Sequence, residues 1–166
     1  MLRSTRKILL SLGHNCSRIY GDPAVLMPAI YQPKIDLILS DYVIIPHFSE
    51  EEKLRQRFPK EKIISMKGTD YMSVIDRICS TKKVISSSLH GIILAETYGI
   101  PAVFYQDRPE KFNFKYADWY ESTNRSFSIE TNLESAILKK APLPPNLDKM
   151  RYDLESSFPY DLWECL

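Results

Sequence analysis

Short runs of β-branched and aromatic residues alternate along this chain with longer segments of helical pattern, and this alternation constrains the fold more than any other feature. The runs that predict strands are residues 18–20, 42–45, 62–64, 83–85 and 102–105. Strands that alternate with helices are typical of parallel sheets, because parallel neighbours need a crossover connection. The sequence therefore predicts an α/β domain with an open, doubly wound parallel sheet, Rossmann-like in arrangement.

Helical periodicity and end signals predict helices over residues 5–12, 49–57, 70–79, 90–98, 115–122 and 132–139. Gly13 and Gly99 stand where a left-handed cap would end the first and fourth of these helices. One helix has a clear core face, because apolar residues recur at spacings of three and four, namely Met72, Ile75, Ile78 and Cys79.

The length of 166 residues, 44% of them apolar, is enough for one ordinary core. We expect one Rossmann-like domain over residues 1–140. A proline-rich segment begins at residue 141 and leads into an acidic tail with helical character. Residues 141–166 are expected to pack on the domain or to trail from it.

Charge and cysteine content exclude several classes of protein. The net charge is +1 and basic and acidic residues are interspersed, which is not typical of a nucleic-acid-binding surface. The three cysteines are far apart and form no Cys-x-x-Cys pair, so we expect neither a disulfide framework nor a metal site. No window approaches the roughly 20 apolar residues of a membrane span, so no membrane span is expected.

The segment 84–101 carries the most chemical information. It reads as a strand, a turn of three serines (Ser86, Ser87 and Ser88), a helix and a glycine cap. Free amides at a helix N-terminus favour a phosphate or carboxylate guest. His90 lies in the first turn of that helix and is a candidate general acid. The alternative is that the serines only cap the helix and that His90 is a structural histidine.

The same segment resembles the polysaccharide pyruvyltransferase family over the run Ser-Ser-Ser-Leu-His-Gly-Ile-Ile-Leu-Ala-Glu-Thr-Tyr-Gly-Ile-Pro-Ala-Val. Two other stretches agree with it in order and spacing. Residues 21–28, Gly-Asp-Pro-Ala-Val-Leu-Met-Pro, resemble a family element, and residues 43–48 resemble a strand that ends in Pro-His-aromatic. The resemblance covers roughly residues 5–125.

The resemblance implies a GT-B-like fold of two Rossmann-type domains, of which this chain would be the C-terminal one. By the same resemblance, His90 would protonate the methylene carbon of phosphoenolpyruvate. Sugar hydroxyls of an exopolysaccharide or cell-surface glycan would then attack, and a pyruvyl ketal would form with loss of phosphate. The donor would be held by Ser86, Ser87, Ser88, Leu89 and Gly91. The scheme needs no metal and no organic cofactor.

Three further residues are expected to line the site. Asp22 would bind a sugar hydroxyl or cap its own turn, His47 ends a strand at the ligand edge, and Glu96 would bind a ribose or serve as a buried hydrogen-bond partner. Lys111, Phe112 and Tyr116 resemble a downstream family region, but aromatic residues at helical spacing usually pack. One departure is plain: Ser88 stands where family members often have arginine.

The expected partners are phosphoenolpyruvate and a glycan or lipid-linked sugar acceptor. A separate N-terminal-half protein or a homo-oligomer is also expected as a partner. By the resemblance, a separate chain supplies the N-terminal domain, the gene is truncated, or the product has lost activity. The expected location is the cytoplasm, near the inner face of the membrane. Two other functions stay open: a GT-B glycosyltransferase half that binds a nucleotide sugar, and a non-catalytic binding or assembly module.

Overall fold

The computed structural model describes residues 3–35, 37–107 and 113–162, and it contains helices, short 3-10 turns and three strands over these ranges. The elements in chain order are α1 (Arg3–Ser11), η1 (Pro23–Leu26), α2 (Met27–Ile30), β1 (Val43–Ile45), α3 (Glu51–Arg55), η2 (Lys60–Lys62), α4 (Tyr71–Cys79), β2 (Val84–Ser86), α5 (Leu89–Thr97), β3 (Ala102–Phe104), α6 (Phe114–Ser122), α7 (Leu133–Leu138), α8 (Asp148–Ser156) and η3 (Tyr160–Leu162).

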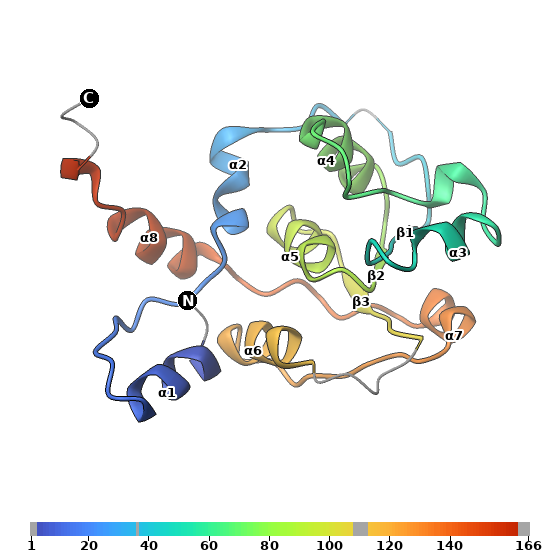
Figure 1. Ribbon diagram of the computed structural model, residues 1–166. Coiled ribbons are helices and arrows are strands. Elements are labelled where there is room, and N and C mark those ends of the chain that lie inside the picture. Colours follow the sequence, from blue (N-terminus) through green and yellow to red (C-terminus); the bar gives the residue numbers. More distant parts are fainter. Residues whose placement is uncertain (1–2, 36, 108–112, 163–166) are drawn as a thin grey trace.

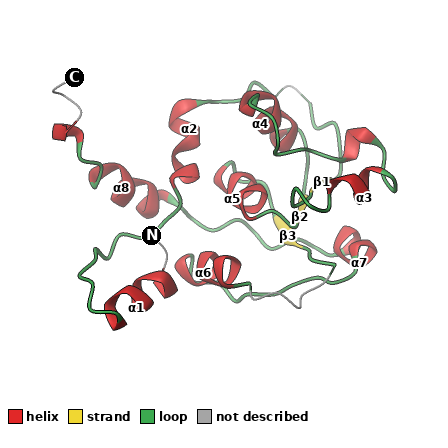
Figure 2. Cartoon of the chain, viewed as in Figure 1, coloured by secondary structure: helices red, strands yellow, loops and turns green. Residues whose placement is uncertain are grey.

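The three strands form one parallel sheet in the order β1, β2, β3, with Ile44 opposite Ile85 and Ile85 opposite Val103 (Figure 2). Isolated parallel bridges extend it at both edges, from Ile44 to Ile63 and from Tyr105 to Glu130. After β1 the chain therefore runs outward to Ile63 before it crosses back to β2. This reversal lies between β1 and β2, which is where open α/β sheets bind their ligands.

Alternate strand residues enter two separate cores, one on each face of the sheet. Val43 and Ile45 of β1 belong to the larger core, which includes residues of α4, α5 and α6. Ile44 belongs to the smaller core, which is built with residues of α3 and α7. Figure 1 shows the strands between α5 on one side and α3 and α7 on the other. Helices on both faces confirm the doubly wound α/β fold.

Local signals explain where several helices begin and end. The Asp70 carboxylate accepts a hydrogen bond from the Ser73 amide at 3.1 Å, and this contact caps α4. Gly13 and Gly99 have φ values of +84° and +76°, which confirms the two left-handed caps.

Three expectations about the elements were wrong in part. Residues 18–20 form no strand, and residues 62–64 contribute only the bridge at Ile63. β-propensity yields a strand only where a neighbouring strand supplies a ladder, and the segment that leads to η1 has none. Met72 is 46% exposed, so the core face of α4 consists of Ile75, Ile78 and Cys79.

The two terminal helices pack on the domain. The buried Asp118 carboxylate of α6 accepts from the Thr5 amide and hydroxyl at 3.1 and 2.6 Å, which holds the start of α1. Helix α8 contacts η1, and Arg151 donates to the carbonyls of Val25 and Thr97 at 3.0 and 2.7 Å. Within the described ranges, every helix is too short or too polar to span a bilayer.

Candidate active site

The loops that follow β1 and β2 meet at the carboxyl edge of the sheet. The Ser87 amide donates to the Ile45 carbonyl at 3.2 Å, and the Ser87 hydroxyl accepts from the His47 amide at 2.8 Å. These contacts place the serine turn and the Pro-His segment together at the point where the chain reverses.

Ser86 and Ser87 shape the turn rather than face solvent. Ser86 is fully buried, and its hydroxyl lies 2.8 Å from the carbonyl oxygens of both Ile45 and Ser88. The Ser87 hydroxyl donates to the Glu50 carboxylate, and the residue is 4% exposed. Both side chains therefore have their hydrogen-bonding capacity used inside the protein.

Gly91 allows α5 to approach the strands closely. A Cβ atom at this position would lie 2.5 Å from the Ser86 hydroxyl oxygen and 2.7 Å from Cγ2 of Ile45. Leu89, 8% exposed, anchors the same turn in the larger core. The Leu-His-Gly segment thus combines a buried anchor, an outward-facing residue and a contact that only glycine permits.

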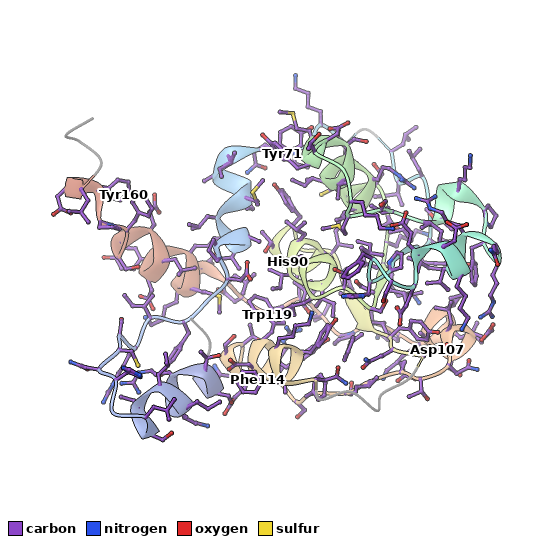
Figure 3. All side chains as sticks on the ribbon, in the orientation of Figure 1. Tyr71, His90, Asp107, Phe114, Trp119 and Tyr160 are labelled. Carbon is purple, nitrogen blue, oxygen red and sulfur yellow. The ribbon has the colours of Figure 1, made fainter. Side chains whose placement is uncertain are left out.

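Ser88 is half-buried and His90 is exposed, unlike the two buried serines of the turn. The Ser88 hydroxyl has no hydrogen-bond partner within the described residues. The His90 side chain, which Figure 3 labels at α5, is 65% exposed. In the same part of the chain, the amides of His90 and Gly91 lack an acceptor, as expected for the first turn of a helix. This edge therefore offers free donors and an accessible imidazole.

Asp22 lies beside the imidazole. Its Oδ1 accepts from the Ala24 amide at 2.9 Å and caps η1, while its Oδ2 lies 3.8 Å from Nε2 of His90. The Asp22 side chain is 21% exposed. The carboxylate can therefore cap its own turn and pair with a protonated His90 at the same time.

His47 lies at the same edge, with Nδ1 2.8 Å from the Ser49 hydroxyl and its ring 4.3 Å from that of Phe48. Glu50, which the sequence did not single out as a site residue, connects the two loops through Ser87. Its position a few residues after β1 was the signal available, since such positions face the ligand edge of a parallel sheet.

Glu96 lies inside the protein, away from the open edge. Its carboxylate is 1% exposed, accepts from both terminal nitrogens of Arg125 at 2.6 and 2.8 Å, and also accepts from Nε1 of Trp119 at 2.9 Å. The structure thus brings together every expected site residue except Glu96, which is bound as a buried hydrogen-bond partner.

Tyr116 of α6 is buried behind the serine turn and holds it through a hydrogen bond. Its hydroxyl donates to the Ser87 carbonyl at 2.7 Å, and its ring stacks on Phe104 with a centroid separation of 4.2 Å. Burial raises the pKa of Tyr116 to about 12, so the hydroxyl keeps its proton at neutral pH. Lys111 and Phe112 lie outside the described residues.

The described residues contain no cluster of three or more His, Cys, Asp or Glu side chains arranged to hold a metal ion. The described open edge presents neutral donors, the imidazoles of His90 and His47, and the carboxylate of Asp22.

Comparison with known proteins agrees with this geometry. The family model for polysaccharide pyruvyl transferase matches residues 3–107, which include α1, η1, all three strands and α5. This match ends before residue 125, where the resemblance read from the sequence was expected to end.

A curated relative, the uncharacterized protein L143 of Acanthamoeba polyphaga mimivirus, is 32% identical over 90 residues. The alignment covers 51% of this chain and 31% of the viral protein, so the chain spans about a third of that relative's length. A search of the solved structures found no match.

The family model covers well over half of the chain, including the turn, the histidine and the sheet edge on which they lie. This chain therefore belongs to the polysaccharide pyruvyl transferase family.

Proposed function

We propose that this chain carries the donor site of a pyruvyl transfer reaction, in which phosphoenolpyruvate pyruvylates a sugar of an exopolysaccharide or cell-surface glycan. The observation that carries the proposal is the exposed His90 imidazole at the open N-terminus of α5, with the Asp22 carboxylate 3.8 Å away. Membership of the family supports a transferase.

The phosphate of the donor would bind at the N-terminus of α5. The Ser88 hydroxyl and the amides of His90 and Gly91 are unengaged donors there, and the positive end of the helix dipole favours an anion. With serine in place of the arginine that relatives often have at position 88, these neutral donors hold the phosphate. Ser86, Ser87 and Leu89 act indirectly, because they fix the turn.

His90 acts as the general acid. Its imidazolium gives a proton to the methylene carbon of phosphoenolpyruvate, which becomes a methyl group, and positive charge develops on the adjacent carbon. One sugar hydroxyl attacks that carbon, the bond to phosphate breaks, and a second hydroxyl closes the ketal. The two hydroxyl protons pass to the neutral imidazole and to the departing phosphate.

Asp22 is a positioning residue for this step. A carboxylate 3.8 Å from Nε2 lies where it can orient the imidazole ring. Asp22→Asn retains an acceptor for the Ala24 amide, so it is expected to lower the transfer rate while phosphoenolpyruvate still binds.

The contacts of Glu96 do not favour a nucleotide sugar as donor. Its carboxylate is 1% exposed and is bonded to Arg125 and Trp119 inside the protein, so a ribose cannot reach it. The glycan or lipid-linked acceptor would contact a further domain. The cytoplasm, near the inner face of the membrane, is the proposed location.

Thermal melting with phosphoenolpyruvate or uridine diphosphate separates the functions. Phosphoenolpyruvate at 100 times its dissociation constant should stabilise the fold by about 2.7 kcal/mol, and the nucleotide should not. The reverse result would support a glycosyltransferase half, and no shift with either ligand would support a non-catalytic module.

Transfer of labelled pyruvate to glycan then tests the acid. We expect His90→Ala to lower transfer by about 10²–10⁴-fold with melting unchanged. His14→Ala, which removes an exposed histidine far from the turn in sequence, is the matched control and should leave transfer unchanged.

A further inference from the structure

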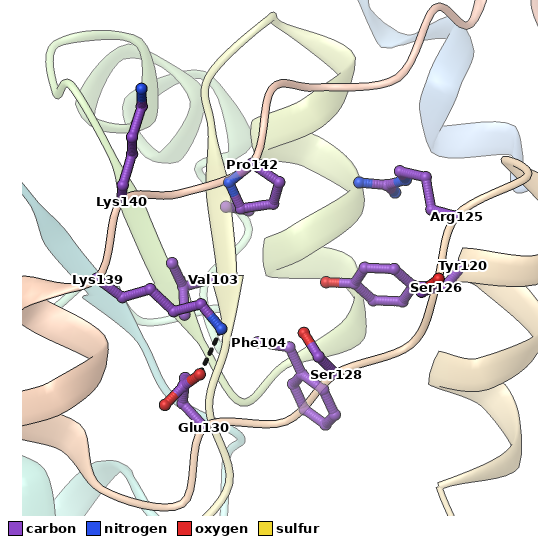
Figure 4. Close-up of a pocket in the computed structure, with 11 residues that line it drawn as sticks. Val103, Phe104, Tyr120, Arg125, Ser126, Ser128, Glu130, Lys139, Lys140 and Pro142 are labelled. Carbon is purple, nitrogen blue, oxygen red and sulfur yellow. Dashed lines mark hydrogen bonds and ion pairs between the residues drawn. The ribbon is translucent and has the colours of Figure 1, made fainter.

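A cavity of about 360 Å³ lies beside β3, the outer strand of the sheet, apart from the serine turn (Figure 4). It is formed by β3, the end of α6, and the segments 125–130 and 139–142. Its volume falls within the range of about 300–1,000 Å³ that small-molecule sites usually have. None of the residues assigned to the donor site lines it.

Tyr120 supplies a buried polar group to this cavity. The residue is 4% exposed, and its hydroxyl points into the space beside Pro142 and Phe104 (Figure 4). Among the described residues this hydroxyl has no hydrogen-bond partner, unlike that of Tyr116 one turn earlier. Burial, and secondarily the charge of Glu96, raise the pKa of Tyr120, so the group is a neutral hydroxyl at neutral pH.

Two serines of the segment that follows α6 add further hydroxyls. Ser126 and Ser128 alternate with Phe127, whose ring packs 5.6 Å from Phe104 and 5.7 Å from Tyr120, in a segment without helical structure. Both serines line the cavity, and neither hydroxyl has a partner within the described part of the chain. Three hydroxyls thus face one cavity, and each can both donate and accept a hydrogen bond.

Among the described residues, one positively charged side chain that lines the cavity is not paired with an acidic residue. Arg125 is bound by Glu96, and Lys139 forms an ion pair with Glu130. Lys140 also lines the cavity, is exposed, and has no partner for its ammonium in the ranges that the structure describes. Figure 4 shows its side chain extended away from Tyr120 and Ser128, so this flexible side chain has to turn for its ammonium to reach a ligand in the cavity. A ligand with a single negative charge would complement this arrangement.

Val103, Phe104 and Pro142 give the cavity an apolar wall. Sugar rings present C–H groups that pack on apolar side chains, and hydroxyls that donate and accept. We propose that this cavity binds one sugar unit that carries a carboxylate, a hexuronic acid, with its ring on the apolar wall, its hydroxyls on Tyr120, Ser126 and Ser128, and its carboxylate at Lys140.

An NMR titration of the chain with glucuronate, methyl glucuronide, glucose and inorganic phosphate tests this site without any measurement of transfer. Glucuronate should shift the backbone amides of Ser126, Ser128 and Lys140. Tyr120→Phe should weaken glucuronate binding about threefold to tenfold, as expected for the loss of one hydrogen bond. Lys140→Gln, at an exposed position that does not affect folding, should weaken glucuronate but not glucose.

Each possible outcome decides something. Tighter binding of methyl glucuronide supports a unit within a glycan, and tighter binding of free glucuronate supports a free sugar acid. No shifts at these amides, or identical shifts with phosphate, would overturn the proposal. Equal affinity for glucose and glucuronate would overturn the inference that the bound sugar carries a carboxylate. Phosphoenolpyruvate binding should be the same in Tyr120→Phe and in the unchanged protein, so failure here leaves the donor-site proposal standing.

Discussion

Two parts of one six-residue segment differ in what their polar groups do. Ser86 and Ser87 are buried and bonded to Ile45, Ser88, His47 and Glu50. The side chains of half-buried Ser88 and exposed His90 form no hydrogen bonds among the described residues. A rigid, internally satisfied turn can therefore hold free groups at a fixed place, as preorganised sites require.

The largest loss of stability is expected from a substitution at Gly91, where α5 lies close to the strands. The Cβ of Gly91→Ala would meet Ser86 and Ile45 at 2.5 and 2.7 Å, so α5 or β1 must shift. We expect a loss of about 3 kcal/mol, equivalent to roughly 6–12 °C in melting temperature. Gly68→Ala is the control, because its nearest contact would be 3.9 Å away, and it should change stability by less than about 0.5 kcal/mol. Equal melting of the two variants would contradict the close approach.

Ser87→Ala should produce the next largest effect. It removes the acceptor of the His47 amide and the donor to Glu50, and it leaves both groups without this partner at a largely buried site. We expect a loss of about 1–3 kcal/mol in the free energy of unfolding, measured by urea denaturation. A neutral result would mean that the two loops are not joined through this hydroxyl.

The two tyrosines of α6 allow the same comparison between a bonded and an unbonded hydroxyl inside the protein. Tyr116→Phe loses a hydrogen bond to the Ser87 carbonyl and should cost about 1 kcal/mol. Tyr120→Phe loses no bond within the described residues and should be neutral or slightly stabilising. Denaturation curves of the two variants under the same conditions check this order, and the opposite order would show that the Tyr120 hydroxyl is satisfied within the protein.

Ser88→Ala should have the smallest effect on folding, within about 0.5 kcal/mol, because its hydroxyl bonds to nothing among the described residues. Its effect should instead appear in the affinity for phosphoenolpyruvate, lowered about threefold to tenfold. Calorimetric titration measures this. A stability loss like that of Ser87→Ala would remove the distinction between the two serines.

Much of the fold follows from local signals in the sequence. Caps and periodicity predict most of the helices near their observed ends, because residues such as Asp70 and Gly99 act on their own neighbours. Strands depend on partners elsewhere in the chain. Residues 18–20 therefore look like a strand and are not one, and residues 62–64 keep only a bridge at Ile63.

The site shows the same limit. The motif predicts a turn, an exposed edge and His90, all of which are encoded within a few residues. It does not reveal which serine is free, because that depends on Ile45, His47 and Glu50, about 40 residues away. Nor does it reveal that Glu96 is occupied by Arg125, a contact between distant parts of the chain.

A backbone amide NMR titration with phosphoenolpyruvate shows whether this ligand binds at the start of α5. We expect the largest shifts on the amides of His90 and Gly91, with saturable binding that is unaffected by glucuronate. Saturable binding whose largest shifts lie elsewhere, or no binding at all, would contradict the proposed donor site.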